Sequence, residues 1–259
     1  SCPKCKSRHI RSFGSGTQKI EEELLKQFSN CTVLRMDIDT TTYKNSHEEI
    51  LGKFRDNNVN ILVGTQMIAK GHDFPRVTLV GVLAADSLLN TGDYRATERT
   101  FQLITQVAGR AGRGELSGRV FIQTYNTENF SIITACNQDY ASFYRQEIML
   151  RKRLMYPPFT NLACVIISGV NDRLTLSTSV NMKKQMEKHL CEAENVQILG
   201  PSRAPVSKIK NRYRWRIIIK CKDMDILLGV LTNVTDTFYS KAGEHSVNLS
   251  VDINPVNML

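Results

Sequence analysis

The chain has 259 residues and a mass of 29.3 kDa, enough for two domains with hydrophobic cores of their own. Its composition, 41% hydrophobic and 23% charged, is that of a globular protein, and no apolar run approaches the ~20 residues that a membrane-spanning helix needs. The polar, basic residues 1–12 do not resemble a signal peptide. We therefore expect neither a membrane protein nor a secreted one.

Charge and cysteines indicate the partner and the compartment. The net charge of +9 favours a polyanionic partner. Residues 151–259 carry about +7 and residues 1–150 about +2, which predicts a basic appendage on a nearly neutral first part. Seven cysteines, an odd number scattered along a long chain, are typical of reduced thiols. We therefore expect a cytoplasmic protein.

The first 150 residues alternate between strand-like and helix-like segments. The expected strands are short and apolar, as buried parallel strands tend to be, and Ser46 is expected to cap a helix. We expect strands at residues 9–14, 32–37, 59–64, 77–83 and 119–125, and helices at residues 17–28, 46–57, 95–108 and 129–150. Repeated βα units predict an α/β fold with a doubly wound parallel sheet, in which ligands bind at the loops after the strands.

The expected domain boundary lies in residues 151–159, where a basic run and Pro157-Pro158 end the last helix. Beyond it the expected order is strand, helix, strand, strand, helix, strand. These elements span residues 162–168, 173–191, 196–200, 213–221, 225–239 and 247–253. That order predicts the split βαβ arrangement of ferredoxin-like domains, and hence a smaller α+β domain.

The segment Gly64–Phe74, with the sequence GTQMIAKGHDF, follows an expected buried strand. Thr65 and the neighbouring backbone N–H groups suit a nucleic-acid phosphate at a helix N-terminus. Asp73 suits a ribose hydroxyl or an arginine that it orients, and the alternative is a simple loop carboxylate. His72 fits a turn cap as well as it fits a functional role.

The segment Gln106–Gly114, with the sequence QVAGRAGRG, combines two arginines with three glycines. Arg110 and Arg113 share a face if they continue a helix, and the glycines let the backbone approach whatever the arginines contact. Two guanidinium groups beside such a backbone suit phosphoryl oxygens, and such an arginine neutralises charge in the transition state of phosphoryl transfer. The alternative is a solvated basic turn.

Two weaker signals lie near the start of the chain. A glycine turn leads into the helix that begins at Thr17, which is a generic anion site, so Thr17 is a candidate phosphate contact. Cys2 and Cys5 have the C-x2-C spacing of half a zinc site. Zinc needs four ligands and no second pair follows, so either these thiols are inert or the other ligands lie upstream in a longer protein.

Residues 203–222 carry eight basic side chains and no acidic one. The period of two in a strand places Arg212, Arg214 and Arg216 on one face and their aromatic neighbours on the other. The arginine face suits a phosphate backbone, and the aromatic rings suit single-strand binding by stacking. The alternative is a solvated arginine face with the rings in the core.

The segments at 64–74 and 106–114 resemble motifs V and VI of superfamily 2 helicases. Along nearly its whole length the chain resembles the primosomal protein N′ family, the replication-restart DNA helicases of bacteria. The strings that carry this resemblance are CPKC, GTQKIEEEL, RMDIDTTTYKNSHEEIL, GTQMIAKGHDFPRVTLVGVLAADSLL, DYRATERTFQLITQVAGRAGRG, YPPF, the GP–AP pair at 200–205 and YRW. The sequence after Trp215 diverges, so no partner-protein contacts are transferred to it.

The resemblance implies a domain organisation. It places the end of a truncated zinc-binding module at residues 1–7, a RecA-like second helicase lobe at 8–150 and a basic α+β domain at 151–259. The Thr17 segment matches motif IV, which faces the nucleic-acid strand. Cys2 and Cys5 match the last pair of an eight-cysteine, two-zinc module.

The resemblance also implies site residues. Arg113 would be the arginine finger on the γ-phosphate of ATP with Mg²⁺, Arg110 would help to hold the same group, and Gln106 would lie near the nucleotide. Gly71 and Asp73 would couple the nucleotide state to DNA, and Gly109 would belong to the ATP-binding side. The expected DNA contacts are Thr17, Thr65, Gln66, Lys70, Arg212, Arg214 and Arg216.

The family's activity is ATP-dependent 3′-5′ DNA unwinding that restarts stalled forks and assembles the primosome in the bacterial cytoplasm, at the nucleoid. The implied partners are forked and single-stranded DNA, single-stranded-DNA-binding protein and other primosome proteins. No G-x-x-x-x-G-K-[ST] occurs in this sequence, so we expect a phosphate-binding lobe upstream and no ATP hydrolysis by this chain alone. The alternatives are a non-catalytic nucleic-acid-binding scaffold and another superfamily 2 helicase.

Overall fold

A computed structural model describes the chain in ranges that leave out parts of the N-terminus and several loops. The described residues are 16–37, 39–41, 43, 46–56, 59–69, 74–112, 117–190, 196–240 and 246–258. The chain divides into two units, one formed by Ser1–Ala85 with Gln102–Thr127 and the other by Asp86–Phe101 with Glu128–Leu259. Within the described ranges, no helix has both the length and the apolarity to cross a membrane.

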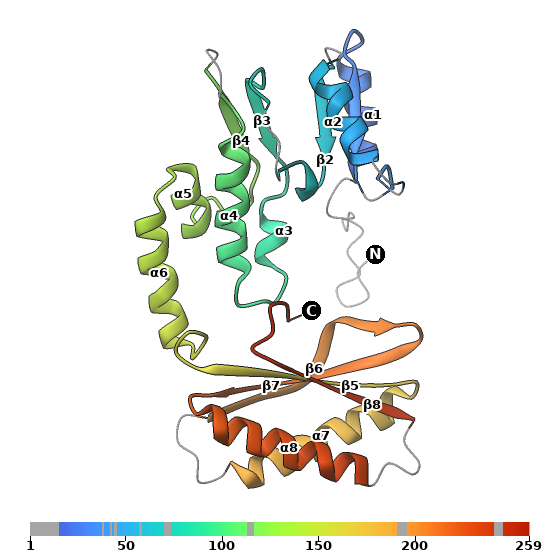
Figure 1. Cartoon of the computed structure of the whole chain (residues 1–259), viewed down its shortest axis with the longest axis vertical. Helices are drawn as coiled ribbons and strands as arrows, with labels where there is room; N and C mark the ends of the chain where they lie inside the picture. Colours follow the sequence, from blue (N-terminus) through green and yellow to red (C-terminus); the bar gives the residue numbers. More distant parts are fainter. Residues whose placement is uncertain are drawn as a thin grey trace, which may run out of the picture. The chain divides into compact units, whose positions relative to one another are not determined.

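Two helices pack on a pair of parallel strands in the first unit. α1 (Thr17–Gln27) and α2 (Ser46–Asp56) contact β1 (Val33–Met36), which pairs with β2 (Ile61–Gly64). All four elements lie within the segments that the sequence predicts for them. Figure 1 shows the two helices and the strands together, in blue. The βαβ pattern of this region is therefore confirmed.

Short segments frame these elements. The hydroxyl of Ser46 donates to the carbonyl of Tyr43 at 2.7 Å, so this side chain fixes the chain that enters α2. After β2 the chain forms the 3-10 helix η1 (Gln66–Ala69), in which Ile68 N donates to Thr65 O at 3.2 Å. The strand predicted at residues 9–14 lies outside the described residues.

A second parallel pair belongs to the same unit. β3 (Leu79–Val82) pairs with β4 (Arg119–Ile122), and Ala85 N donates to Gln123 O beyond the strands at 3.0 Å. The α/β class and the parallel pairing agree with the sequence. The described strands of this unit, however, form two separate pairs, β1–β2 and β3–β4, and not one doubly wound sheet. Alternation along the sequence does not specify which strands become neighbours, because the pairing joins residues far apart in the chain.

The helix predicted at residues 129–150 is wrong as a single element. After α3 (Asp86–Leu89) and α4 (Ala96–Ala108), the chain forms α5 (Phe130–Cys136) and α6 (Tyr140–Arg153). Between α5 and α6, Gln138 has a φ of +53°, which breaks the helix. The side chain of the next residue, an aspartate, then accepts from a backbone N–H of the first turn of α6 and starts a new helix.

The C-terminal part of the second unit is a four-stranded antiparallel sheet with two helices on one face (Figure 1). Its elements are β5 (Asn161–Gly169), α7 (Asp172–His189), β6 (Val196–Ile209), β7 (Arg212–Cys221), α8 (Met224–Ser240) and β8 (Val247–Ile253). The strands lie in the order β6-β7-β5-β8. The elements follow one another in the predicted order, but β6 continues well beyond the predicted residue 200.

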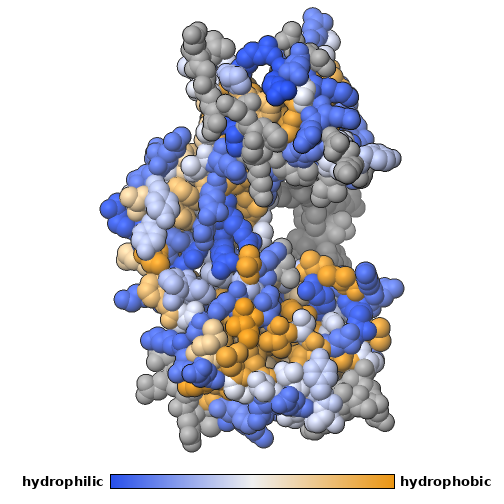
Figure 2. All heavy atoms as spheres, viewed as in Figure 1, coloured by the Kyte–Doolittle hydropathy of each residue, from blue (hydrophilic) through white to orange (hydrophobic). Residues whose placement is uncertain are grey.

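The core of this domain lies between the sheet and the helices α7 and α8. Alternate residues of β5 face the helices, among them Val165 and Ile167, which have no exposed surface, and Ile217 and Ile219 of β7 do the same. Figure 2 shows hydrophobic atoms gathered around this layer. Each such side chain contributes about 1.5–3 kcal/mol when it is fully buried, so the period-2 pattern determines which sheet face the helices cover.

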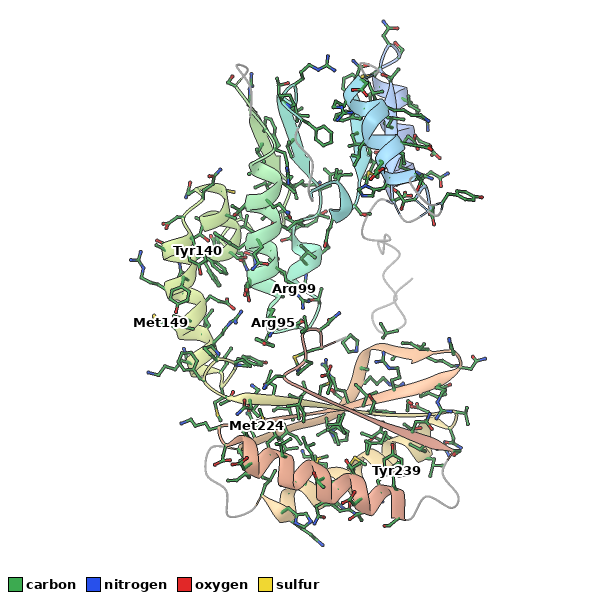
Figure 3. All side chains as sticks on the ribbon, viewed as in Figure 1. Arg95, Arg99, Tyr140, Met149, Met224 and Tyr239 are labelled. Carbon is green, nitrogen blue, oxygen red and sulfur yellow. The ribbon has the colours of Figure 1, made fainter. Side chains whose placement is uncertain are left out.

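Aromatic contacts tie the start of α4 to α5 and α6. The Phe101 ring stacks on Phe143 with centroids 4.3 Å apart, and Phe143 lies 5.8 Å from Phe130. Tyr140, marked on α6 in Figure 3, adds a contact to Phe101 at 6.1 Å. The start of α4, together with α5 and α6, therefore belongs to the unit that contains the C-terminal sheet, whereas the sequence predicted a boundary in residues 151–159. Local composition cannot reveal such packing, since the partners lie about forty residues apart.

Candidate functional site

The turn that follows α4 carries the first arginine of the QVAGRAGRG segment. Gly109 and Arg110 still donate their backbone N–H groups to carbonyls of α4, at 3.0 Å each. The Arg110 side chain is half-buried, and Gln106, one turn earlier, is exposed. Helical geometry therefore extends to the arginine and sets its direction relative to Gln106. Arg113 lies outside the described residues.

Glycine shapes the loop after this turn. Gly112 has a φ of +72°, in the left-handed region, and its N–H donates to Val77 O at 3.0 Å. A Cβ on Gly118 would lie 2.4 Å from Gly112 N, so the two sides of the loop approach too closely for a side chain. Gly112 therefore ties this loop to the entrance of β3, and the expected approach of the backbone to a ligand stays a prediction.

Two of the expected DNA contacts lie at the carboxyl edge of the β1–β2 pair. Thr65 and Gln66 directly follow β2 and are exposed. A Cβ on Gly64 would lie 2.5 Å from Met36 O, so the two strand ends need glycine to come this close. The edge of a parallel pair is where ligands bind in α/β folds. Lys70, Gly71, His72 and Asp73 lie outside the described residues.

Thr17 reaches the same edge by a hydrogen bond that the sequence did not reveal. Its hydroxyl donates to the carboxylate of Asp37, the residue after β1. Asp37 also accepts from Thr40 N at 3.0 Å and pairs with Arg35 at 3.3 Å. The Thr17 hydrogen bond is the main reason why the pKa of Asp37 lies below its usual value, and burial opposes it. An aspartate directly after a buried strand was the signal that would have identified it.

The arginines of β7 lie on the sheet face opposite α7 and α8, as predicted, but each donates to a backbone carbonyl. Arg212 bonds to Ser168 O (2.9 Å) and Ser246 O (3.2 Å). Arg214 bonds to a carbonyl of β6 at 3.1 Å, and Arg216 bonds to the carbonyl of residue 258 at 2.7 Å. These bonds use part of each guanidinium and fix its position, so the face is not simply solvated.

A cation covers each aromatic ring of β7. Arg203 lies over the Trp215 ring, 5.0 Å from its centroid, and pairs with Asp172 at 2.6 Å. The Trp215 indole donates to the same carboxylate at 2.9 Å, which together with Arg203 lowers the pKa of Asp172. Lys208 lies over the Tyr213 ring at 4.7 Å. The rings are half-buried and partly covered, so they offer little surface for stacking a base.

The start of α4 carries a polar cluster that the sequence analysis missed. Asp93 is buried and accepts from Arg95 N at 3.0 Å and from Arg99 at 2.9 Å. The side chains of Arg95 and Arg99, marked in Figure 3, both donate to Val256 O. Asp93 also accepts from a third donor, Met258 N, at 3.4 Å. The C-terminal residues of the chain are thus held through their backbone by the first turn of α4.

A stack of rings and cations continues from this cluster into the sheet. Tyr94 stacks on Tyr156 with centroids 5.0 Å apart, and Lys220 of β7 lies 3.8 Å from the Tyr156 centroid. Lys220 is 4% exposed and donates to Leu154 O at 2.7 Å. Burial lowers the pKa of this lysine. Arg151 of α6 lies over Tyr94, so the stack connects α6 and β7 with the segment before α4.

Arg151 also bridges α6 and α4 through carboxylates. Its guanidinium pairs with Glu98 at 2.6 Å and with Glu147 at 2.8 Å, and Glu147 accepts from Thr97 at 2.7 Å. Burial alone would lower the pKa of Arg151, but the hydrogen bonds to the two carboxylates raise it. This network holds the first half of α4 in one orientation.

The described part of the chain holds no group of three or more His, Cys, Asp or Glu side chains that could bind a metal. Cys2 and Cys5, the expected zinc ligands, lie outside it. The described cysteines at positions 31, 136, 164 and 221 are free thiols, as the sequence predicted.

Two family models match consecutive parts of the chain. Residues 6–115 match the helicase conserved C-terminal domain, and residues 152–256 match the primosomal protein N C-terminal domain. The first range contains the Arg110 turn and the β1–β2 edge. The second contains the antiparallel sheet with its helices.

Several curated proteins are similar over the whole chain. Replication restart protein PriA of Bacillus subtilis (strain 168) is 44% identical over 259 residues, which are 100% of this chain and 32% of that protein. PriA of Synechocystis sp. is 40% identical (99% and 30%), and that of Treponema pallidum (strain Nichols) is 35% identical (100% and 38%). The chain thus spans about a third of the length of these relatives. Among solved structures, the de novo designed protein Foldit4 matches 38% of this chain and 99% of its own chain, with a TM-score of 0.30 and 7% identity. This similarity is too weak to indicate a shared fold.

The helicase match covers the unit that carries the arginine turn, the primosomal match covers the basic sheet domain, and the identities with the three relatives extend across both. Together these findings show that the chain belongs to the PriA family of replication restart proteins, the primosomal proteins N.

Proposed function

We propose that this chain works as the C-terminal part of an ATP-dependent 3′-5′ DNA helicase that restarts stalled replication forks and assembles the primosome. The observation that carries the proposal is the turn after α4, where Arg110 continues a helix inside a segment that matches a helicase domain. A guanidinium on a helix end, tied to a strand by Gly112, is positioned well enough to act on a phosphoryl group.

In this proposal ATP with Mg²⁺ supplies the phosphoryl group that is transferred to water. The residues of this chain bind that group and neutralise its negative charge. Arg113 acts as the arginine finger on the γ-phosphate, and Arg110 helps to hold the same group. Gln106 and Gly109 lie on the nucleotide side, and Gly71 and Asp73 couple the nucleotide state to the DNA strand. The lobe that holds the remaining phosphates belongs to another part of the full-length protein.

The DNA strand would lie along the carboxyl edge of the β1–β2 pair. Thr65, Gln66 and Lys70 contact it there, with Thr17 close by, since the Thr17 hydroxyl is already bonded to this edge. The basic domain, of the split βαβ kind, adds a second DNA surface that includes the arginines of β7. Forked and single-stranded DNA, single-stranded-DNA-binding protein and other primosome proteins are the partners proposed for the full-length protein, in the bacterial cytoplasm.

Zinc is proposed as a structural ion that Cys2 and Cys5 hold together with two further ligands from the rest of the protein. Two thiolates alone do not complete its preferred tetrahedral set. In the full-length protein, changing both cysteines to serine is expected to reduce the zinc content measured by atomic emission.

The test of the proposed function is an arginine substitution in the full-length protein. Arg113→Ala is expected to lower kcat for DNA-stimulated ATP hydrolysis by about 10³-fold or more, with ATP affinity changed far less. Arg119→Ala removes an exposed arginine of β4 in the same unit and serves as the matched control. Wild-type hydrolysis by the Arg113 variant would refute the role of the arginine. If the wild-type protein binds DNA but hydrolyses no ATP, the result would favour the alternative function, a non-catalytic nucleic-acid-binding scaffold.

A further inference from the structure

The hydroxyl of Thr17 has one proton to donate, and a carboxylate of this chain already accepts it. Thr17 is the first residue of α1, and its hydroxyl donates to Asp37, the residue after β1. A carboxylate and a DNA phosphate both accept hydrogen bonds and do not donate them. Thr17 therefore cannot donate to Asp37 and to a phosphate at the same time.

The carboxylate of Asp37 is also held by groups other than Thr17. Asp37 is buried, and one of its oxygens accepts from Thr40 N at 3.0 Å. Arg35 lies 3.3 Å from the other oxygen, the one that Thr17 contacts. The turn itself is fixed by a hydroxyl, since Thr41 donates to Asp37 O at 2.6 Å. If the Thr17 hydroxyl turned away, the carboxylate would therefore keep a cation and a backbone donor.

This carboxylate lies at the edge of the β1–β2 pair to which the DNA strand was assigned above. Asp37 directly follows β1 and Thr65 directly follows β2, its parallel partner, so both residues lie at the carboxyl ends of these strands. A phosphate that reaches Thr17 therefore meets the negative charge of Asp37. Arg35 does not cancel that charge fully, because it is shared with Glu21, whose carboxylate lies 3.8 Å away.

We propose that Asp37 sets the affinity of this edge for single-stranded DNA by competing with a phosphate for the Thr17 hydroxyl. The inference rests on the proposed function, which places the strand and Thr17 at this edge. In the free protein the hydroxyl donates to Asp37. In the complex it donates to a phosphate, while the carboxylate stays on Arg35 and Thr40 N. Asp37 thus acts through Thr17 as a positioning residue, and its competition makes the strand easier to release.

The test is a double-mutant cycle in the full-length protein. Asp37→Asn removes the charge and leaves one oxygen acceptor for two donors, the Thr17 hydroxyl and Thr40 N, whereas Thr17→Val removes the hydroxyl and keeps the branched shape. Binding of labelled oligo(dT) is measured by fluorescence anisotropy, and urea unfolding shows that each variant is folded. We expect Asp37→Asn to bind the strand about fivefold more tightly, because a charge that repels a nearby phosphate is lost.

The two substitutions are expected to be coupled. In the wild type, binding exchanges one charged acceptor of the Thr17 hydroxyl for another, so the hydroxyl gains little. In Asp37→Asn it exchanges a neutral acceptor for a charged one, and hydrogen bonds to charged groups are stronger. Thr17→Val should therefore weaken strand binding about fivefold more in Asp37→Asn than in the wild type. Asp39→Asn is the matched control, since it removes an exposed carboxylate of the same loop, and its effect should be independent of Thr17.

The DNA concentration that half-maximally stimulates ATP hydrolysis should fall in Asp37→Asn, whereas a purely structural role of Asp37 would raise it and lower the maximal rate. Weaker or unchanged strand binding by Asp37→Asn overturns the proposal, and so does a Thr17→Val effect that is equal in the two backgrounds. If Asp37→Asn does not fold, a loss of more than about tenfold in Thr17→Val alone overturns it, because the hydroxyl would then gain far more than an exchange of acceptors allows. Failure of the helicase proposal would look different, since the wild-type protein would then hydrolyse no ATP while the anisotropy cycle still showed the coupling.

Discussion

At the scale of single residues, Asp37 connects the loop after β1 to the first residue of α1. Its carboxylate accepts from Thr17 and Thr40 and pairs with Arg35, and the pKa is held below the usual value of 3.8. A carboxylate whose pKa is lower in the folded protein stabilises it above the unfolded pKa. That stabilisation is lost as the pH falls from about 3.8 through the folded value.

We expect Thr17→Ala to destabilise the chain by about 1–2 kcal/mol at pH 7, because it removes a hydrogen bond to a charged group. The variant should lose less stability than the wild type between pH 6 and pH 2.5, since its Asp37 pKa returns toward 3.8. Urea unfolding at several pH values measures both effects. Thr17→Ser keeps the hydroxyl and is the control. Parallel pH curves for wild type and Thr17→Ala would contradict the role of this bond.

Lys220 has the opposite pH dependence. Burial lowers the pKa of this lysine, so between the folded value and 10.5 the unfolded chain binds more protons than the folded one. The free energy of unfolding of the wild type should therefore rise relative to Lys220→Met as the pH increases from 7.5 toward 10. Chemical denaturation at pH 7.5, 9 and 10 measures the difference. A difference that stays constant over this range would show that the ammonium is not desolvated.

At the scale of elements, α4 is held at its first turn by charges and further along by aromatic rings. Asp93 connects three donors there: Arg95 N, the Arg99 side chain and Met258 N. Phe101 adds a stacked contact to α6. The helix that leads to Arg110 is therefore anchored at the end remote from it.

Asp93→Ala is expected to destabilise the second unit by about 2–3 kcal/mol. A buried ion pair that loses one partner costs about 3–5 kcal/mol, and the value is reduced here because the Arg99 side chain is 34% exposed. Thermal unfolding followed by the fluorescence of Trp215, which lies in this unit, measures the loss. Glu187→Ala breaks a pair on the surface of α7 and is the control, with an expected cost below about 1 kcal/mol. Equal losses in the two variants would contradict the anchoring of α4.

At the scale of the whole molecule, α4 belongs to both units. Its residues up to Phe101 lie in the second unit, and those from Gln102 onward lie in the first. One continuous helix therefore passes from the anchoring cluster to the arginine turn.

The chain by itself is expected to hydrolyse no ATP, with or without single-stranded DNA. It has an arginine segment but no G-x-x-x-x-G-K-[ST] loop to hold the other phosphates. A coupled ATPase assay on the purified chain, with a mock preparation as the control, tests this. Activity above the mock level that disappears in Arg113→Ala would contradict it, because both halves of the site would then lie in this chain.

The sequence by itself determined the element types and the motifs. The periodicity of apolar residues sets helix or strand locally, so α1, α2, β1, β2 and five of the six elements of the C-terminal domain lie close to their predicted positions, whereas β6 extends to Ile209. The segments around Thr65 and Arg110 could also be recognised as candidate sites from the sequence, because the spacing of arginine, glycine and threonine is a local property of the chain.

Only the tertiary structure decided what each charged side chain contacts. Arg99 donates to Val256 across 157 residues, and Arg212 donates to the carbonyl of Ser168 in β5 and to that of Ser246 just before β8. Sequence spacing could not reveal that these cations have partners within the protein. The separate strand pairs and the break between α5 and α6 are further results of this kind. The physical reason is common to all: burial and long-range hydrogen bonding depend on which segments meet, and local periodicity does not encode this.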